Sequence, residues 1–488
     1  MNKRLRLGGG LLVLGLGAAF ADTHYVSTNG LSNPPYTNWP DAATNIQAAG
    51  DQASDGDEVV VSNGVYSGAG RSGFYWPNTT NVVTIANAIT LRSASGSEST
   101  CIDGQMTNRC LYVDNPNAQV QGFTLAHGFG GGVGGGAGLV AGQMRDCAAI
   151  NSQADWGGGV AVMYARIANC TIQANTGIKG GGIVVYQAEV KHCTVSGNRA
   201  GEGGGIYSQG SALVEDCTII GNTAVNIGGG ISMMWDTDPE GAGGYGTLRH
   251  SVVEGNWATN MGGGVSVFSG RVENCVIAGN ACSGKNGAGG GIENWHSTMM
   301  NCTITRNSAT WIGGVYLRGG YATNTIMHSN PPLDYYSSGS PVCSFCCTQP
   351  AIPGGVGNID GDPQFVNALS NDFHLMASSP CIDAGTNTDD TIGGTDIDGQ
   401  PRVCNGRVDI GADEACVIGA SIRAADPVTT VWDSVVGGEY VLQRTTDLNT
   451  TNWTQVGQTG ATQQAQVTFV DTNAAADRAF YRLLWLRP

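Results

Sequence analysis

Residues 180–205 read GGGIVVYQAEVKHCTVSGNRAGEGGG, which is a glycine triplet, short apolar runs around a cysteine, an asparagine and the next glycine triplet. The unit recurs, since the last glycine of each run stands at 136, 159, 182, 205, 230, 264, 291 and 314. Five units place an asparagine five residues after the cysteine, and the pairs are Cys170 and Asn175, Cys193 and Asn198, Cys217 and Asn222, Cys275 and Asn280, and Cys302 and Asn307. Ser251 with Asn256 and Thr325 with Asn330 keep that spacing without the thiol, so the position repeats rather than the sulfur.

The period indicates strands rather than helices. It lies near 23 residues, with short β-branched runs separated by Gly and Asn and no stripe of period 3.6. Such strands close most simply into a solenoid whose coils hydrogen-bond to one another along the axis. A leucine-rich repeat has a similar period, but its spaced leucines are missing here. We therefore predict an all-β chain built on a right-handed parallel β-helix.

Each column of the repeat has an expected place in that solenoid. Two apolar columns should face inward, one three residues before the cysteine position (Met144, Ile167, Val190, Val214, Leu248, Val272, Met299 and Ala322) and one two residues after it (Ile172, Val195, Ile219, Val253, Ile277, Ile304 and Met327). The glycines suit a tight corner with positive φ and a close approach of stacked backbones. The asparagines suit a second corner in the left-handed region, where their amides can bond along the stack.

Composition excludes several classes of protein. The chain has 488 residues, of which 76 are Gly, with only 13% charged residues and a formal net charge of -16. A regular, glycine-rich and acidic chain of this kind is a folded β-protein rather than a disordered one. Binding to nucleic acid or to an anionic membrane is disfavoured by the charge, because basic residues cluster only in the first few positions. We expect a monomer with no membrane span.

Changes in composition predict five segments. Residues 1–21 are typical of a signal peptide, with basic residues, a short apolar run and an A-x-A cleavage site, which predicts export from a bacterial cell. A cap is needed at the open end of a solenoid, and a short helical stretch near 42–54 suits that role. The other segments are an N-terminal cap with the first strands at 22–80, the β-helix at 81–330, terminal coils at 331–415 and a small β-sandwich-like domain at 416–488.

The opening residues and the coils carry a family resemblance. Tyr25-Val26-Ser27 and Gly56-Asp57-Glu58-Val59, with the Gly-Gly-Gly-Ile and Cys-Thr-Ile-x-x-Asn coils, are similar to secreted bacterial right-handed β-helix repeat proteins. The repeat also resembles the Gly-Gly-Ala-Ile and Phe-x-x-Asn signature of chlamydial polymorphic outer-membrane proteins, and Phe123 stands in the cysteine column here. The resemblance covers roughly 23–415 and implies a pectin lyase-like fold. Because these families include adhesins and many members of unknown role, it implies little about chemistry.

Residues 331–415 resemble the choice-of-anchor Q region found at the end of such β-helices. The resemblance rests on Asp360-Gly361-Asp362-Pro363, Ser379-Pro380-Cys381-Ile382-Asp383, Asp396-Ile397-Asp398-Gly399 and Val408-Asp409-Ile410-Gly411. In that family the region precedes attachment or sorting modules. The resemblance therefore implies display at the cell surface.

Fifteen cysteines allow either disulfides or buried thiols, and the odd number leaves at least one unpaired. Thiols of the repeat column should point inward as small apolar groups, because side chains stacked in parallel do not readily reach the torsion of a disulfide. The better candidates for bridges are Cys101 with Cys110, Cys381 with Cys404, and pairs among Cys343, Cys346 and Cys347.

Acidic, glycine-rich turns near the end of the solenoid offer hard oxygen ligands. They make calcium the expected metal if one binds, with Asp396, Asp398 and Asp409 as its ligands. An EF-hand spacing is missing from these turns, and the same carboxylates could instead cap backbone amides. Neither interpretation requires a cofactor.

The strand that opens each coil should carry an aromatic ribbon. Alternation with period two after the glycines sends every second side chain outward. The outward positions proposed for carbohydrate are Tyr186, Tyr207, Phe268, Trp295, Tyr316 and Arg318. Sugar rings stack on aromatic faces beside polar groups. Cross-strand packing that only shields the sheet explains the same pattern equally well.

One coil is longer than its neighbours, and the excess is the loop 235–245, which should project beside that ribbon. The candidate catalytic residues are Asp236, Asp238 and Glu240 in the loop and Glu293 and His296 two coils along. A lyase would need a base beside a cation, and Arg318 is the basic residue placed there. The paired Asp or Lys/Arg motifs of pectin hydrolases and lyases are missing.

The main prediction is an exported, surface-associated β-helix that presents an elongated binding face to a polysaccharide or another cell-surface component. The alternative is a β-helix polysaccharide lyase or glycoside hydrolase acting at the long-loop coil, and a structural envelope protein is third. Carboxylates converging in a cleft would favour the enzyme, whereas a flat aromatic surface would favour binding.

Overall fold

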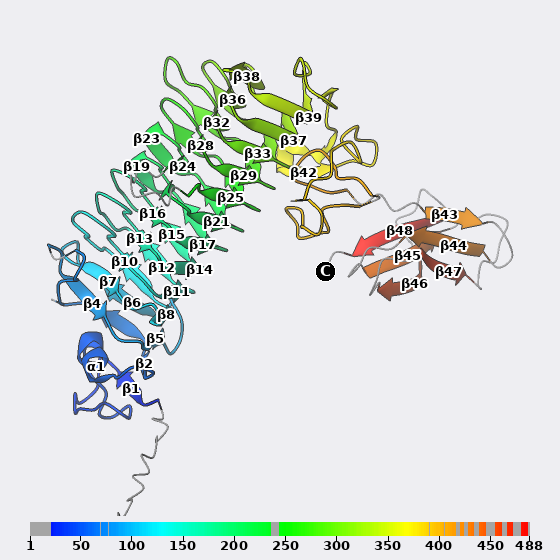
Figure 1. Ribbon diagram of the computed structural model, residues 1–488. Coiled ribbons are helices and arrows are strands. Elements are labelled where there is room, and N and C mark those ends of the chain that lie inside the picture. The colour runs from blue at the N-terminus through cyan, green and yellow to red at the C-terminus, as the bar shows by residue number, and fades with distance from the viewer. Residues whose placement is uncertain are drawn as a thin grey trace, which may run out of the picture.

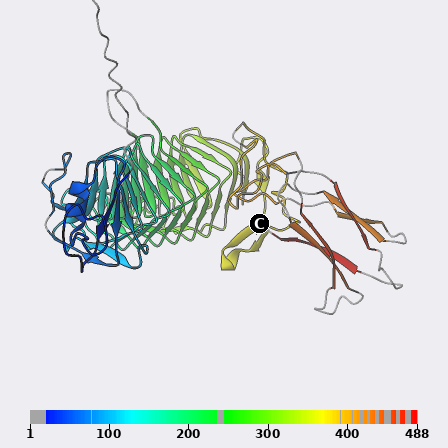
Figure 2. The same cartoon turned by 90° about the horizontal axis from the view of Figure 1, so that it is seen from below.

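The computed structural model describes residues 21–488, except for 69, 77, 236–243, 390, 405, 416–419, 424–427, 434–438, 446–453, 461–465, 472–479 and 487–488. Strands wind into about eleven coils stacked along one axis (Figure 1). A view from below shows the same elongated stack of coils (Figure 2). The expected all-β, right-handed parallel β-helix is confirmed. The signal-like segment, apart from its last residue, lies outside the described residues.

One parallel sheet of eleven strands carries the opening strand of each coil. Its order is β4 (Asn81–Ile85), β7 (Arg109–Val113), β10 (Ala137–Leu139), β13 (Val160–Met163), β16 (Ile183–Tyr186), β20 (Ile206–Gln209), β24 (Ile231–Met234), β28 (Val265–Phe268), β32 (Ile292–Trp295), β36 (Val315–Arg318) and β38 (Tyr335–Ser338). The eight strands from β10 to β36 in this order directly follow a glycine run. The register is constant, so equivalent residues of neighbouring coils lie side by side.

A sheet of twenty-four strands consists of two parallel stacks that join in the long strands β37 (Tyr321–His328) and β39 (Val342–Thr348). The first stack comprises β1 (Thr23–Val26), β2 (Glu58–Val61), β5 (Thr90–Ser93), β8 (Gln119–Gln121), β11 (Gln143–Arg145), β14 (Arg166–Ala168), β17 (Glu189–Lys191), β21 (Leu213–Glu215), β25 (Thr247–Arg249), β29 (Arg271–Glu273) and β33 (Thr298–Met300). The second stack comprises β3 (Gly64–Tyr66), β6 (Thr100–Asp103), β9 (Thr124–Ala126), β12 (Ala148–Ile150), β15 (Thr171–Gln173), β18 (Thr194–Ser196), β22 (Thr218–Ile220), β26 (Val252–Glu254), β30 (Val276–Ala278), β34 (Thr303–Thr305) and β40 (Ile359–Asp360).

Smaller elements complete the described chain. A five-stranded corner sheet comprises β19 (Arg199–Glu202), β23 (Thr223–Ile227), β27 (Trp257–Ala258), β31 (Ala281–Cys282) and β35 (Ser308–Ala309). After the coils come β41 (Phe365–Asn367), η1 (Ala368–Ser370) and β42 (Asp372–Leu375). Two antiparallel sheets of three strands follow, one of β43 (Ala420–Arg423), β44 (Val428–Asp433) and β47 (Gln466–Asp471), the other of β45 (Glu439–Thr445), β46 (Thr454–Gly460) and β48 (Phe480–Leu486).

The helix expected near the open end is present as α1 (Ile46–Gln52). It packs against β1, β2 and β4, with Ile46 and Ala49 buried. The Asn45 side chain accepts hydrogen bonds from the backbone N–H groups of Gln47 and Ala48, which satisfies two free donors at the first turn. A search of the described residues finds no helix with the length and apolar character to cross a membrane.

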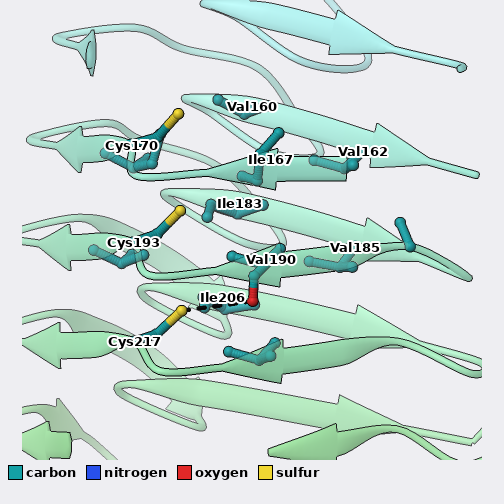
Figure 3. Close-up of a cluster of buried hydrophobic side chains, with 14 of the residues drawn as sticks. Val160, Val162, Ile167, Cys170, Ile183, Val185, Val190, Cys193, Ile206 and Cys217 are labelled. Carbon is teal, nitrogen blue, oxygen red and sulfur yellow. Dashed lines mark hydrogen bonds between the residues drawn. The ribbon is translucent and has the colours of Figure 1, made fainter. Parts of the chain in front are cut away.

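The core confirms both predicted apolar columns. Ile167 and Val190 of the first column are 1% and 0% exposed, and Ile172 and Val195 of the second are fully buried. Figure 3 shows Ile167 and Val190 in successive coils, pointing into the space that the strands enclose, next to the stacked cysteines. The coils therefore share one continuous apolar core.

The glycine triplets form the tight corner that the sequence predicts. The first glycine of each run has a positive φ, for example 60° at both Gly180 and Gly203. The second lies against the next coil, because a Cβ on Gly181 would meet the Gly204 carbonyl oxygen at 2.5 Å. Both roles exclude a larger residue.

The asparagine corner corrects the prediction in one respect. The left-handed conformation belongs to the residue before each asparagine, with φ of 62° at Gly197 and 58° at Arg306. That turn directs the next side chain into the interior, where Asn198 Nδ2 donates to the Ile172 carbonyl at 2.9 Å and to Asn222 Oδ1 at 3.0 Å. The predicted bonding of amides along the stack is confirmed, but the expected left-handed φ at the asparagines themselves is wrong.

The cysteines of the repeat are buried free thiols, as expected. The predicted bridges are wrong, since Cys101, Cys110 and Cys381 are free thiols, as are Cys343, Cys346 and Cys347. Cys404 is disulfide-bonded, but not to Cys381. Strand geometry explains why Cys346 and Cys347 do not form a disulfide. Adjacent side chains of a strand point to opposite faces, so Cys346 packs in the solenoid core and Cys347 packs in a separate cluster.

The buried thiols, both in the repeat column and at Cys282 in β31, are expected to resist alkylation in the folded protein. Burial raises the pKa of the Cys147 thiol well above its usual range and that of Cys282 to about 12, and the thiolate is the reactive form. Iodoacetamide at about pH 8, read by mass spectrometry, should label these two only after denaturation. The partly exposed Cys101 should be labelled first. Labelling of Cys147 at equal rates before and after denaturation would contradict this account.

Candidate functional site

The aromatic residues expected on the opening strands form separate clusters on the outer side of the eleven-stranded sheet. Tyr207 is only 4% exposed, because Trp156 and Lys179 cover it. The Trp156 and Tyr207 ring centroids lie 5.8 Å apart, and Lys179 Nζ lies 4.9 and 4.6 Å from them. Tyr186 packs edge-on against Tyr164 at 5.7 Å. In this half of the solenoid, cross-strand packing accounts for Tyr207.

A second cluster spans the last coils. Phe268 and Trp295 stack with centroids 5.3 Å apart and planes inclined by 21°. Arg318 follows Trp295 in register, and its guanidinium carbon lies 4.6 Å from the Trp295 centroid and 4.3 Å from that of Tyr316. The arrangement places a cation between two rings, where the ring quadrupoles attract it.

Two further rings extend this cluster, and the sequence analysis missed both. Trp311 lies 5.4 Å from Tyr316 and 5.0 Å from Tyr336, and Tyr336 pairs in register with Tyr316. Register alone could have identified Tyr336, since it continues the Tyr316 column by one coil. Trp295, Trp311 and Tyr336 are 37%, 41% and 40% exposed. The aromatic platform hereafter consists of Phe268, Trp295, Trp311, Tyr316, Arg318 and Tyr336.

A carboxyl group lies beneath the platform. Glu293 is 1% exposed and accepts a hydrogen bond from Ser266 Oγ at 2.9 Å. Its Oε1 lies 3.9 Å from Arg318 Nε, which is buried without a hydrogen-bond partner. Burial raises the pKa of Glu293, and the Ser266 hydrogen bond and the Arg318 charge oppose that shift. Glu293 therefore acts as the buried counterion that holds Arg318 against the sheet.

The residues expected to perform catalysis are not brought together by the described chain. Asp236, Asp238 and Glu240 lie outside the described residues. His296 is exposed, with a φ of 52°, and its ring lies over Gly319, where an added Cβ would meet Nδ1 at 2.7 Å. Among the described residues, no hydrogen bond or ion pair joins His296 to Glu293. Within the described residues, the opening strands of the last coils present exposed rings, and Glu293 has no second carboxyl group as a partner there.

The pair of Glu293 and Arg318 predicts a pH-dependent double-mutant cycle. Arg318→Ala should destabilise the protein by about 1–3 kcal/mol more in the wild-type background than in Glu293→Gln, because it leaves a buried carboxylate unpaired. Because folding raises the pKa of Glu293, its contribution to stability is full when the pH is below the ordinary carboxyl pKa of 4.5. That contribution is lost as the pH rises through the raised pKa of the folded state. The coupling measured by urea unfolding should therefore be larger at about pH 8 than at about pH 4.

Three groups face Glu293, namely Ser266, Arg318 and Cys282. The Cys282 thiol, with its pKa raised to about 12 by burial, stays neutral across this pH range. A coupling energy that is the same at both pH values would contradict the assignment of Arg318 as the counterion.

The acidic residues predicted to bind calcium lie in the turns after β42. Asp396 Oδ1 accepts the backbone N–H groups of Asp398 and Gln400 at 3.0 and 2.7 Å. Asp409 accepts those of Asp383 and Ala415 at 2.6 and 2.7 Å. Burial raises the pKa of Asp396 to about 6 and that of Asp409 to about 7. These two carboxylates cap backbone amides, the alternative considered for them, and calcium binding stays a prediction.

Asp398 has a different environment. It is exposed, and its Oδ2 lies 2.7 Å from His374 Nε2 rather than beside the other two predicted ligands. The buried guanidinium of Arg402 holds the surrounding turns by donating to the carbonyls of Ala412 and Asp409 at 3.0 and 3.2 Å. The turn that carries Asp398 is held by the hydrogen bond from its own backbone N–H to Asp396 Oδ1.

Comparisons with known proteins add little to this picture. No family model and no curated protein matches the chain. Among solved structures, it is similar to pectate lyase Pel9A, with a TM-score of 0.44 and 16% identity over 82% of this chain and 97% of that one. It is also similar to XylC in complex with xylose, with a TM-score of 0.37 and 10% identity over 95% of this chain and 100% of that one. Similarity at this level assigns neither a family nor an activity.

Proposed function

We propose that this protein is an exported, surface-associated β-helix whose aromatic platform binds a polysaccharide. The observation that carries the proposal is the cluster of exposed rings, with Trp295, Trp311 and Tyr336 each more than a third exposed on adjoining coils. Exposed apolar residues that form one contiguous patch mark binding surfaces, whereas apolar residues scattered singly over a surface do not. Their flat faces suit the C–H faces of sugar rings, and the repeat provides a row of such positions along a polymer.

Arg318 supplies the polar part of the proposed site. Its guanidinium carries five N–H donors, and the rings of Trp295 and Tyr316 fix its plane. Sugar hydroxyls are natural acceptors for the donors on the exposed part of the guanidinium, since Nε is buried and the side chain is 24% exposed. The formal net charge of -16 repels an acidic polymer at long range, so the combination favours a neutral polysaccharide.

Binding is favoured over cleavage by the position of the nearest carboxyl group. A glycoside hydrolase needs two carboxyl groups that reach the bond from either side. Glu293 is 1% exposed beneath the platform, where a polymer lying on the rings does not reach it. A second carboxyl group does not join it within the described part of the chain.

Export and surface association are the other part of the proposal. Export rests on the signal-like residues 1–21, and surface display rests on the resemblance of 331–415 to the choice-of-anchor Q region. Cell fractionation with an antibody to the chain tests this part separately. Recovery in the cytoplasmic fraction alone would contradict it, without bearing on the platform.

A panel of soluble polysaccharides tests the binding proposal. The purified protein is incubated with neutral xylan, mannan and β-glucan and with acidic pectate and alginate, and both retention and released ends are followed. We expect retention on a neutral polymer with no new reducing or unsaturated ends. Ends released by the wild type and not by Asp236→Ala would instead establish the enzyme. An absence of both retention and cleavage across the panel would contradict carbohydrate binding.

A further inference from the structure

A pocket lies between the second stack and the turns that follow β42. Its volume is about 160 Å³, and it is partly open to solvent. Its lining includes the apolar side chains of Val252, Val276 and Phe373 and the polar ones of His374, Asp398 and Asp413. The aromatic platform contributes none of the lining residues. The pocket is therefore a second candidate site, separate from the proposed binding surface.

The three polar residues converge within the reach of one ion. One ligand atom from each of His374, Asp398 and Asp413 lies within 4.8 Å of the others. The closest pair is His374 Nε2 and Asp398 Oδ2, 2.7 Å apart. These residues come from β42 and from two separate turns, so only the folded chain brings them together.

The orientation of His374 fits a metal ligand. Its Nδ1 lies 2.5 Å from Asp372 Oδ1, so the tautomer protonated at Nδ1 donates a hydrogen bond to that carboxylate, and Nε2 faces the cluster. Histidine ligands in metal sites nearly always donate their other ring N–H to a carboxylate or carbonyl in this way. Asp372 is thus placed as a positioning residue for His374.

Asp413 is the most buried member of the cluster. Its side chain is only 6% exposed, and Oδ2 accepts the backbone N–H of Leu375 at 2.9 Å. The side chain lines the pocket beside His374 and Asp398. Withdrawing a carboxylate from water costs free energy, and a bound cation would offset that cost.

We propose that His374, Asp398 and Asp413 bind a divalent transition metal ion of the zinc class in this pocket. One imidazole nitrogen and two carboxylates form a three-ligand set that suits zinc, cobalt or nickel and leaves a coordination position open toward the pocket. Calcium prefers oxygen ligands alone and a larger number of them. The set differs from the calcium ligands predicted from sequence, because Asp396 and Asp409 are already occupied by backbone N–H groups.

Calorimetric titration of the chelator-treated full chain with zinc chloride tests the proposal. We expect one zinc ion to bind per chain and calcium to bind at least about tenfold more weakly. His374→Ala and Asp398→Asn should abolish zinc binding. Asp372→Asn should weaken it by about 10–100-fold, since it leaves the ligands in place and removes only their orienting partner. Cobalt in place of zinc should give visible absorption bands that report nitrogen and oxygen ligation.

Asp360→Asn is the matched control, because Asp360 is an exposed carboxylate of the same region that lies outside the pocket. It should bind zinc as the wild type does. Circular dichroism before each titration confirms that a variant is folded, and Asp398, being exposed, is the substitution least able to disturb the fold. Failure of the wild type to bind zinc would overturn the proposal. So would zinc binding that survives in both His374→Ala and Asp398→Asn, because the ion would then lie elsewhere.

Discussion

Replacing Trp295 with alanine is expected to weaken binding of the retained polysaccharide by at least about tenfold, or about 1.4 kcal/mol. The substitution removes an exposed ring that stacks on Phe268 and also one of the two rings that fix Arg318. The fold should persist, because the side chain points outward from β32 and is 37% exposed. Equilibrium titration with the polymer, monitored by intrinsic fluorescence or calorimetry, measures the effect.

Phe74→Ala is the control for loss of an exposed aromatic ring. Phe74 is 83% exposed and contacts Tyr75 rather than the platform. It should leave the affinity unchanged, whereas Trp311→Ala should weaken it as Trp295→Ala does. Wild-type affinity in both tryptophan variants would contradict the assignment of the platform as the binding surface.

Replacing Asn280 with alanine is expected to destabilise the solenoid by about 3–5 kcal/mol, the largest stability effect of a single substitution considered for the core. Asn280 is fully buried, and its Nδ2 donates to Val253 O and to Asn307 Oδ1, both at 2.9 Å. Its Oδ1 accepts from Asn256 N and Asn256 Nδ2 at 2.9 and 3.0 Å. Alanine removes the side-chain donor to the Val253 carbonyl and the acceptor of the Asn256 N–H, and it leaves Asn256 Nδ2 with the Ile219 carbonyl alone.

Urea unfolding and hydrogen exchange measure this effect at two levels. Because neighbouring coils of a solenoid can open without the whole array, exchange of the amides around Asn256 should accelerate more than exchange near α1. Asn226→Ala is the matched control. Asn226 is exposed and its side chain accepts one hydrogen bond from Asn260, so the change should cost less than about 0.5 kcal/mol. Equal shifts of the unfolding midpoint in the two variants would show that the buried asparagine ladder carries no special stability.

The solenoid could be predicted from the sequence because each column of the repeat has one environment. The positions of Val190 and Val195 face the interior in every coil. An apolar residue is therefore needed at the same two positions in each repeat, and the sequence shows that pattern several times. The glycine corner could be predicted equally well, since a positive φ and close contact between backbones both exclude side chains.

The asparagine corner was harder to place, because its two requirements fall on adjacent residues. The left-handed φ falls on Gly197 in one coil but on Ala174 and Arg306 in others, so the column does not consist of one residue type. The side-chain requirement is strict and falls on the asparagine. Because the asparagine repeats in every coil from Asn175 to Asn330, the left-handed conformation was predicted for it rather than for the residue before it.

The candidate sites could be predicted only in part. Alternation along the strands gave the outward direction of Tyr207 and Tyr316, but both are nearly buried. The residues that cover them, Trp156 and Trp311, lie in corners whose path depends on tertiary structure. The cluster at His374 could not be found from spacing, because its members lie in turns without periodicity.

Radical footprinting of the protein with and without the retained polysaccharide tests the central claim most directly, because it locates the bound polymer residue by residue. We predict that the polymer protects Trp295, Trp311 and Tyr336 from oxidation, while Phe74 and Tyr164 react equally in both samples. Protection confined to residues away from the platform, with these three rings still reactive, would contradict the account.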